Sequence, residues 1–317
     1  MYRLILLAIV SLPALLDPAA ARAQGAEPIK IALNWVPEPE FGGIYAAQQA
    51  GIFKANGLDV QILPGGAGAP IWQMVGAGKV PFGIASADEV AIARTRGADI
   101  MALFAIYQTC PQAIMVHEES GHKSIADVFN RGGGMLAMEK GLTYSRFLEK
   151  KYGFGKVKLV GYSGGIAAFL ADKNYAQQCF IFSEPIAARR QGAKVKTFLV
   201  ADAGYNPYTG VLIARTDYVK ANMGTVNAMI KSFREGWQQY LSDPRPANDL
   251  MHSLNKTMDM QTFTEAAEAQ KPLVLPEGMK PDQIGTMTLD RWQTLISQMR
   301  DLKVLDRDVD AQACFLP

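Results

Sequence analysis

Short apolar runs alternate along the chain with longer stretches in which apolar residues recur every three or four positions. Runs of the first kind predict strands, and stretches of the second kind predict helices. In the first block this rule predicts strands over 29–33, 58–63, 80–85 and 101–107, and helices over 44–53, 71–77 and 89–96. Glycine-rich turns separate these elements, and Ser86 is placed to cap the third helix.

The same alternation continues in the second part of the chain. It predicts strands over 112–117, 134–138, 157–160, 179–182, 195–200 and 211–214. Between them it predicts a short helix capped by Ser124 and ending at Phe129, a helix capped by Thr143 and ending at Tyr152, and helices over 166–171 and 185–191. From Thr216 onward the pattern is mostly helical.

Repeated strand–helix units are typical of parallel sheets covered by helices, so we predict an α/β fold with two parallel-type sheets. The tail beyond residue 211 has a single strand, so we expect it to pack back onto the first block. The expected lobes are 24–112 plus 208–317 and 113–207, joined by two crossings near 109–113 and 203–209. Such a molecule has a hinge and a cleft, and small ligands bind α/β sheets at the carboxyl ends of the strands.

The first 23 residues have the three parts of a secretory signal. A basic residue, Arg3, precedes an apolar run over 4–16, and Ala21-Arg22-Ala23 supplies the small-residue exit. The apolar run is too short for a permanent membrane span. No cysteine precedes Cys110, so a lipid-anchored cysteine at the exit is not expected. We therefore expect 1–23 to be a signal peptide and the mature protein to be periplasmic.

Composition narrows the classes of partner. The chain carries 32 basic and 30 acidic residues, a formal charge of +2, which favours neither nucleic acid nor a membrane surface. Three cysteines and three histidines are too few for a disulfide scaffold or a metal cluster, and we expect no metal or other cofactor. Cys110, Cys179 and Cys314 allow at most one bridge, and a buried free Cys179 is an equal alternative.

Nucleotide and zinc motifs fail on spacing. Lys79 follows G-A-G but lacks the upstream glycine of a phosphate loop, and residues 66–71 miss the last glycine of a dinucleotide fingerprint. His117 and His122 are five residues apart, off a common helix face, and are expected in a solvated loop.

One catalytic alternative passes the spacing test. Residues 161–165 read G-Y-S-G-G between a strand and a helix, as a nucleophile elbow requires. Asp202 and His252 follow Ser163 in the order of a hydrolase triad. No H-G-G oxyanion loop precedes the motif, so the competing interpretation is a glycine loop that faces a ligand.

The residues at the predicted strand ends are aromatic, small or polar. Aromatic rings stack on flat ligands, glycine loops offer backbone N–H donors, and carboxylates accept from ring N–H or amino groups. This set suits recognition better than chemistry, so we predict a non-catalytic ligand site. Its expected residues are Trp35, Glu38, Phe41, Tyr45, Gly66, Ser86, Asp88, Tyr107, Gln108, Glu139, Thr143, Tyr162, Ser163, Glu184 and Tyr208.

Several of these segments resemble a known family. Residues 34–39 read N-W-V-P-E-P, and residues 43–60 continue with A-G-I-F and K-A-N-G-L-D-V. Residues 79–88 and the F-S-E-P of 182–185 extend the pattern. The chain resembles substrate-binding proteins of ABC importers, in the branch with sulfonate and taurine binders and binders of thiamine pyrimidine precursors. The resemblance implies a type II two-lobed fold that closes on its ligand as a monomer and delivers it to an inner-membrane permease.

Within that branch, Trp35 in its N-W-x-P context resembles the binders of aromatic ligands. No arginine lies at the strand ends to hold a sulfonate. An aminopyrimidine suits stacking on Trp35 with Glu184, or secondarily Glu38, as acceptor; a flavin-like ring and a sulfonate remain alternatives. Cytosolic relatives that synthesise the pyrimidine carry a cysteine-rich motif that this chain lacks. A sensor subunit with the same fold is a further alternative.

Overall fold

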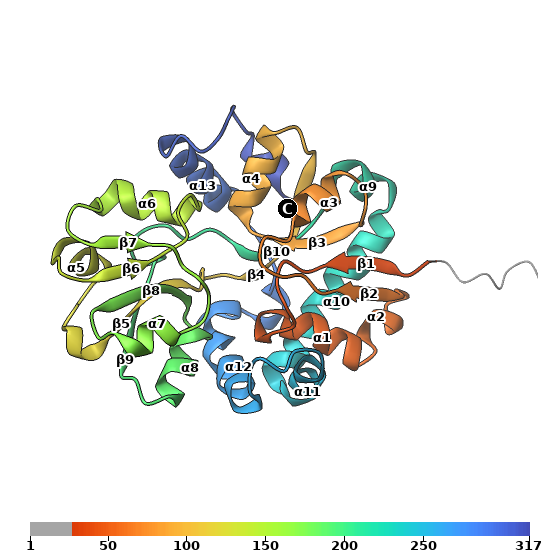
Figure 1. Cartoon of the computed structure of the whole chain (residues 1–317). Helices are drawn as coiled ribbons and strands as arrows, with labels where there is room; N and C mark the ends of the chain where they lie inside the picture. The colour runs from red at the N-terminus through yellow and green to blue at the C-terminus, as the bar shows by residue number, and fades with distance from the viewer. Residues whose placement is uncertain (1–26) are drawn as a thin grey trace, which may run out of the picture.

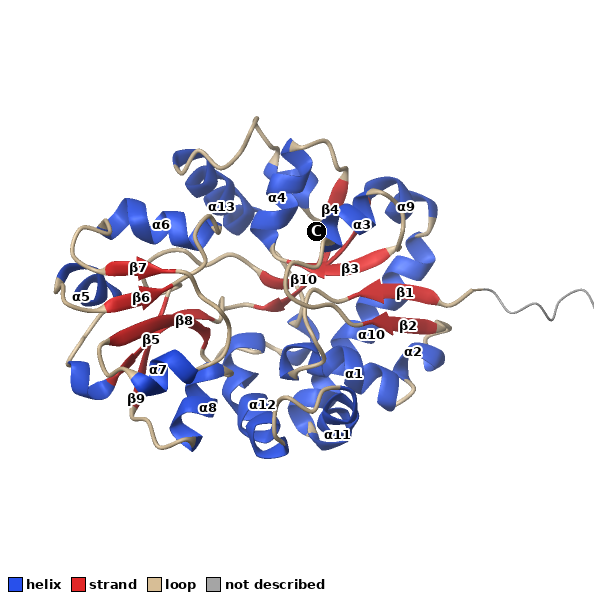
Figure 2. Ribbon diagram, viewed as in Figure 1, coloured by secondary structure: helices blue, strands red, loops and turns tan. Residues whose placement is uncertain are grey.

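The computed structural model describes residues 27–317 and shows two lobes, each built on a five-stranded sheet covered by helices (Figures 1 and 2). The strand order is β2-β1-β3-β10-β4 in the first lobe and β7-β6-β8-β5-β9 in the second. The expected signal peptide, 1–23, lies outside the described residues. In that described part no helix is both long and apolar enough to cross a bilayer.

The first lobe combines the start and the end of the chain. Its strands are β1 (Ile29–Ala32), β2 (Val60–Leu63), β3 (Phe82–Ala85), β4 (Ile100–Tyr107) and β10 (Thr209–Arg215). Its early helices are α1 (Gly42–Gln49), α2 (Ile52–Ala55), α3 (Ile71–Gly76) and α4 (Ala87–Thr95). The late helices are α9 (Thr216–Ala221), α10 (Met223–Ser242), α11 (Arg245–Leu254), α12 (Met260–Val274) and α13 (Leu289–Asp301).

The second lobe is a single continuous stretch. Its strands are β5 (Gln112–His117), β6 (Met135–Ala137), β7 (Lys158–Val160), β8 (Tyr175–Phe180) and β9 (Val195–Leu199). Its helices are α5 (Ile125–Asn130), α6 (Thr143–Tyr152), α7 (Ala167–Ala171) and α8 (Glu184–Arg190). The two sheets therefore have the same pattern of neighbours, which no periodicity in the sequence indicates.

Both sheets are mixed, so the prediction of parallel-type sheets needs correction. β10 runs antiparallel to β3 and β4, and β5 runs antiparallel to β8 and β9. Each of these strands is the first that its lobe receives after the chain crosses from the other lobe. It therefore enters its sheet from the cleft side, whereas the strand–helix units run toward the cleft. The α/β class and the two-lobed fold are confirmed.

The late helices pack on the first lobe and complete its core. α10 lies against α1 so closely that a Cβ at Gly236 would sit 2.2 Å from the carbonyl oxygen of Gly43. Glycine is needed at this crossing because any side chain would force the helices apart. Trp237, one residue along α10, is fully buried at the same contact. The placement of the expected lobe boundaries at 112/113 and 207/208 stays a prediction.

The predicted caps of the helices are confirmed at two positions and wrong at a third. Ser86 precedes α4, and its backbone N–H donates to the Glu89 carboxylate at 2.9 Å, as in a capping box. Ser124 caps α5 by accepting from the Asp127 N–H at 3.2 Å. Thr143 is not a cap, because it is the first residue of α6 and is buried. The strand expected over 179–182 is β8, which ends at Phe180.

All three cysteines are free and buried, so the alternative of a bridge between any two of them is not realised in the structure. His117 also differs from expectation. It lies at the end of β5, 1% exposed, with its Nε2 2.7 Å from the Phe169 carbonyl oxygen and its ring stacked on the Phe169 ring. It is a core residue of the second lobe rather than part of a solvated loop.

Candidate functional site

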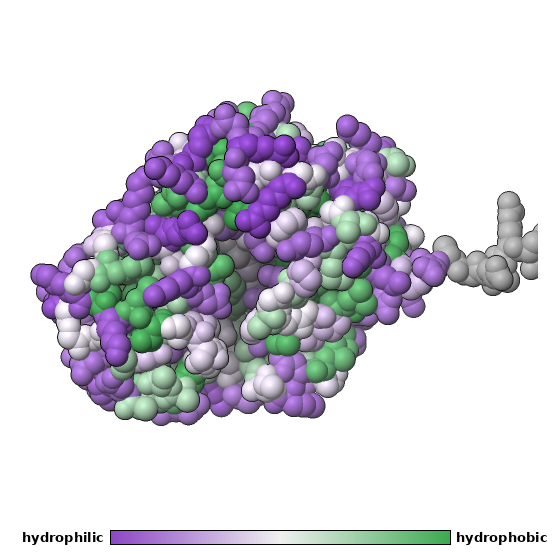
Figure 3. Space-filling model, turned by 45° about the horizontal axis from the view of Figure 1, so that its top comes forward, coloured by the Kyte–Doolittle hydropathy of each residue, from purple (hydrophilic) through white to green (hydrophobic). Residues whose placement is uncertain are grey.

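A furrow separates the two lobes on the face shown in Figure 3. The lobes touch on both sides of the crossings. On one side Arg190 of α8 pairs with Asp259 at 3.2 Å, and on the other the Lys150 ammonium donates to the Asp301 carbonyl at 2.9 Å. The candidate site lies where the turn after β1 approaches the start of α8.

The first-lobe part of the site is the turn that follows β1. Trp35 is 40% exposed, an unusual position for so large an apolar ring. The side chains of Trp35 and Asn255 lie beside Glu38, three residues on, and lower its pKa against the larger effect of burial. The Asn255 amide also donates to the Pro37 carbonyl at 3.2 Å, so the loop after α11 holds this turn in place.

The second-lobe part is the start of α8. The Glu184 carboxylate accepts from the Tyr162 hydroxyl at 2.6 Å and from the Phe180 N–H at 3.0 Å. Tyr162 lies in the loop after β7, so one carboxylate joins the carboxyl ends of β7 and β8. Charge-assisted hydrogen bonds of this kind hold a carboxylate in one orientation.

The carboxyl groups of the two lobes influence one another. Burial, and after it the charge of Glu184, raise the pKa of Glu38 from 4.5 to about 7. Burial also raises the pKa of Glu184, and the pKa of Glu40 is raised well above its usual range by burial and by both other carboxylates. Carboxyl groups in such a cluster are stabilised by any group that donates N–H bonds or brings positive charge, and they repel an anion.

A cavity of about 340 Å³ opens beside Glu38, between the lobes. Its residues come from the turn after β1, from α8 and from the segment that leads into α12. They are Glu38, Ser183, Ala187, Arg190, Gln191, Thr257, Met258, Asp259 and Thr262. Arg190 is engaged by Asp259 and Glu265, so it is not an unpaired cation awaiting a sulfonate.

A second polar group lies on the other side of the crossings. The Ser86 hydroxyl hydrogen-bonds to Asp88, and the Tyr205 hydroxyl donates to the other oxygen of Asp88 at 3.4 Å. Thr143, at the start of α6, hydrogen-bonds to Tyr205. The structure thus brings together three of the expected residues, from the carboxyl ends of β3 and β6, through Tyr205 in the turn after β9.

Four of the expected aromatic residues lie in packing positions. Phe41 and Tyr45 are 2% and 1% exposed within the first-lobe core. Tyr107 stacks on Phe182 with ring centroids 5.4 Å apart, and Tyr208 lies 3.9 Å beneath the Arg291 guanidinium. We assign these four to the core and the crossings, because nothing of their rings faces open space.

The other expected residues are scattered around the cleft. The Gln108 amide donates to the Thr286 carbonyl at 3.1 Å, beside the crossings. Glu139 is exposed, and its backbone N–H donates to Gln178 at 2.7 Å. Gly66 is half-buried, and an added Cβ there would meet nothing within 4 Å.

The hydrolase alternative fails on geometry. A nucleophile elbow holds its serine in a strained turn. In the loop after β7 the positive φ angles, 83° and 70°, belong to Gly164 and Gly165, and Ser163 is exposed without one. His252 lies on α11 of the first lobe with its Nδ1 3.1 Å from the Met258 carbonyl, and in residues 27–317 no hydrogen bond joins it to Ser163 or Asp202.

Two contributors escaped sequence reasoning. Glu40 is not among the expected site residues, yet it lies close enough to Glu38 and Glu184 for their charges, after the larger effect of burial, to raise its pKa. Asn255 lies in the helical tail, where no pattern indicated contact with a turn 218 positions earlier. The described residues contain no cluster of His, Cys, Asp and Glu that could hold a metal ion.

Comparisons with known proteins agree with this architecture. The model of a family described as NMT1/THI5 like matches residues 38–247. The formylaminopyrimidine-binding protein of Halalkalibacterium halodurans is 21% identical, over 98% of this chain and 96% of its own. The riboflavin-binding protein RibY of Chloroflexus aurantiacus is 23% identical, over 94% of this chain and 88% of its own. The aliphatic sulphonate-binding protein SsuA of Escherichia coli superposes with a TM-score of 0.68 at 16% identity, over 92% and 93% of the two chains.

Proposed function

The chain belongs to the NMT1/THI5-like family, and from this premise we propose that it is a periplasmic solute-binding protein of an ABC importer. Its ligand is a small, flat heteroaromatic molecule with N–H donors, of the pyrimidine-precursor type. The protein binds this ligand between its lobes and delivers it to a membrane permease without changing a covalent bond. The expected export segment, 1–23, carries the chain out of the cytoplasm and is removed.

The observation that carries the proposal is the position of Glu38 and Glu184 on facing lobes. Burial raises the pKa of each carboxyl group, and the charge of Glu184 also raises the pKa of Glu38 from the facing lobe. Bringing the two together costs free energy that a ligand with N–H groups on both edges recovers. The ligand therefore favours the closed arrangement over the open one, which is what a transport protein requires.

The chemistry of the site selects among the ligands of the relatives. Trp35 offers an exposed ring for stacking, and the carboxylates accept from amino and ring N–H groups. A sulfonate has only acceptor oxygens and a negative charge, so it meets repulsion from Glu38 and Glu184. The isoalloxazine ring of riboflavin is large enough to stack on Trp35. It has only one ring N–H, so it donates to fewer of the carboxylate oxygens.

Calorimetric titration with three probes tests the proposal. We expect a formylaminopyrimidine to bind with a Kd of about 1 μM or tighter, roughly −8 kcal/mol, riboflavin to bind more weakly, and ethanesulfonate not to bind. Glu184→Gln should weaken the pyrimidine at least tenfold. The matched control is Glu149→Gln, an exposed carboxylate on α6 of the same lobe. Tighter binding of the sulfonate than of the pyrimidine would overturn the proposal.

A further inference from the structure

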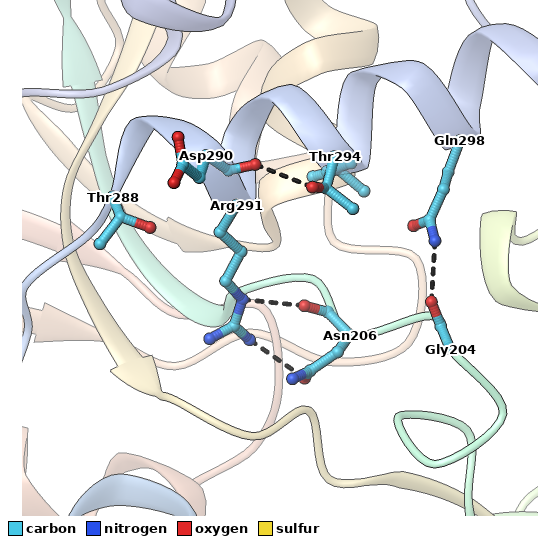
Figure 4. Close-up of a pocket in the computed structure, with 8 residues that line it drawn as sticks. Gly204, Asn206, Thr288, Asp290, Arg291, Thr294 and Gln298 are labelled. Carbon is cyan, nitrogen blue, oxygen red and sulfur yellow. Dashed lines mark hydrogen bonds between the residues drawn. The ribbon is translucent and has the colours of Figure 1, made fainter.

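Arg291, in the first turn of α13, reaches both of the segments that join the lobes, and Figure 4 shows its contacts with Asn206 of the second segment. Its Nη1 donates to the Gln108 carbonyl of the first crossing at 2.6 Å. Its Nε and Nη2 donate to the backbone and side-chain oxygens of Asn206 in the second crossing, at 2.9 and 3.0 Å. Nη2 also donates to the Pro207 carbonyl at 3.2 Å. One guanidinium thus ties the two crossings together.

Neighbouring contacts strengthen this tie. The side-chain oxygen of Asn206 also accepts from the Cys110 N–H at 2.8 Å, which links the second crossing directly to the first. The Tyr208 ring lies 3.9 Å beneath the guanidinium, and its hydroxyl accepts from the Thr288 N–H at 3.0 Å, just before α13. Residues 108–110 and 206–208 are therefore bound to each other and to a helix of the first lobe.

The other end of each crossing is bound to the second lobe. The Ile181 N–H donates to the Pro111 carbonyl at 3.1 Å, and the Val200 N–H donates to the Gln112 carbonyl at 2.9 Å. The turn after β9 folds back on itself, with the Tyr205 N–H 3.3 Å from the Val200 carbonyl. Lys151 of α6 hydrogen-bonds to the Ala203 carbonyl in the same turn. In the first crossing, the residues bound to the first lobe end at 110 and those bound to the second lobe begin at 111. In the second crossing, the change falls between residues 205 and 206.

We propose that Arg291 is the positioning residue of the hinge, and that it confines rotation of the lobes to the peptide segments 110/111 and 205/206. The four oxygens that accept from it are all uncharged, so its half-buried charge is satisfied only while both crossings converge on it. Separating either crossing from α13 leaves part of a charged guanidinium without its acceptors, which is costly. The crossings therefore move with the first lobe as one body, and the lobes rotate about a defined axis.

A contact spans the proposed axis. Gln298, two turns along α13, donates to the Gly204 carbonyl at 2.7 Å, and Gly204 lies on the second-lobe side of 205/206. Figure 4 shows this bond and the Arg291–Asn206 bonds facing one cavity of about 330 Å³. Rotation at 205/206 changes the distance from Gln298 to Gly204 but leaves the Arg291 contacts intact. On rotation, the side of this cavity formed by Arg291 and Asn206 therefore stays fixed, and the side formed by Gly204 moves.

Spin labels on the two lobes test the proposal without any ligand, so the result is independent of the proposed function. Lys54→Cys on α2 and Lys156→Cys before β7 place labels at exposed positions, and the natural cysteines are buried. Pulsed dipolar spectroscopy then gives the distribution of distances between the lobes. In the labelled parent protein we expect a narrow distribution, because one axis permits few relative positions.

Arg291→Lys keeps the charge but cannot reach both crossings, and we expect it to widen the distribution at least twofold. Asn206→Ala should also widen the distribution at least twofold, and it tests the proposal on its own if Arg291→Lys does not fold. Asn206→Asp keeps the shared acceptor and should preserve the narrow width. The control is Arg234→Lys, since Arg234 donates to the Ile284 carbonyl at 2.9 Å within the first lobe. Unchanged widths in Arg291→Lys and Asn206→Ala, or an equal widening in Arg234→Lys, would overturn the proposal.

Discussion

The Tyr162 hydroxyl donates to the Glu184 carboxylate at 2.6 Å and joins two loops at the cleft edge of the second sheet. This bond lowers the pKa of Glu184 against the larger effect of burial, which raises it. Tyr162 therefore keeps Glu184 more ionised than its surroundings alone would allow. Together with the Phe180 N–H, which donates to the other oxygen at 3.0 Å, it fixes the orientation of the carboxylate.

Removing this hydroxyl should weaken ligand binding. We expect Tyr162→Phe to raise the pKa of Glu184 and to weaken binding of the pyrimidine about tenfold at pH 7, a change of about 1.4 kcal/mol. Glu184→Ala should weaken it at least tenfold, and the double variant should add little, because both act on one carboxylate. Calorimetry of the three variants checks this, and additive losses would contradict it.

Trp35 should carry the stacking part of the affinity. Trp237 and Trp292 are fully buried, whereas Trp35 is 40% exposed beside Glu38. We expect Trp35→Ala to weaken pyrimidine binding at least tenfold and to abolish a ligand-induced change in tryptophan fluorescence. Trp35→Phe should keep most of the affinity and still lose the fluorescence signal. A full fluorescence response in Trp35→Ala would place the ligand elsewhere, and an unchanged melting temperature serves as the control for folding.

The raised pKa of Glu38 should make stability depend on pH. The folded protein keeps a proton on Glu38 up to about pH 7, whereas the unfolded chain releases it near 4.5. Because the folded state binds more protons in this window, the free energy of unfolding should fall as pH rises from about 4.5 to 7. Glu40 and Glu184 shift in the same direction and steepen this fall. Urea unfolding between pH 5 and 8 measures how steeply the free energy of unfolding falls with pH. The fall should be shallower in Glu38→Gln, and a rise with pH in the parent protein would contradict the prediction.

Ligand binding should remove the proton from Glu38. A ligand that donates N–H to Glu38 favours the ionised carboxylate, so binding at pH 6 should release protons and the Kd should weaken as pH falls below about 7. Titration in two buffers of different ionisation enthalpy counts the protons. Uptake of protons, or equal release in Glu38→Gln, would be inconsistent with direct contact between the ligand and Glu38.

The sequence predicted elements well where a local rule decides the structure. The strand over 112–117 and the Ser124 cap were right because alternation and capping depend on adjacent residues. The direction of β5 and β10 was not predictable in this way, because it depends on the lobe from which the chain arrives. The expectation of parallel-type sheets is correct for β1 with β2 and β3 and for β6 with β7 and β8, and it fails at β5 and β10 for this reason.

The candidate site was predictable to a similar degree. Trp35, Glu38, Tyr162 and Glu184 follow strands, and the rule that ligands bind at strand ends selects them without a structure. Phe41 and Tyr45 satisfy the same rule, yet they face the core because the turn is followed at once by α1, which packs on α10. Asn255 and Arg291 act over 218 and 183 positions, distances at which a single sequence has no periodic signal.

The contact between α1 and α10 gives a prediction about stability alone. A Cβ at Gly236 would meet the Gly43 carbonyl at 2.2 Å and the Ala47 Cβ at 2.8 Å. We expect Gly236→Ala to destabilise the protein by about 1–3 kcal/mol through overpacking. Gly224→Ala, on the same helix, meets nothing within 4 Å and should be neutral or stabilising by up to about 1 kcal/mol. Equal effects in urea unfolding would show that helix propensity, not close packing, decides both.

The proposed function requires the protein to hold one flat solute between its two lobes and to release it unchanged. The most direct measurement is prolonged incubation with a formylaminopyrimidine, followed by mass spectrometry of the solute that remains bound and of the solute left in solution. We predict one molecule retained per chain, with its mass unaltered in both fractions after hours of incubation. A product of different mass, absent when the protein is heat-denatured beforehand, would show an enzyme and contradict the account.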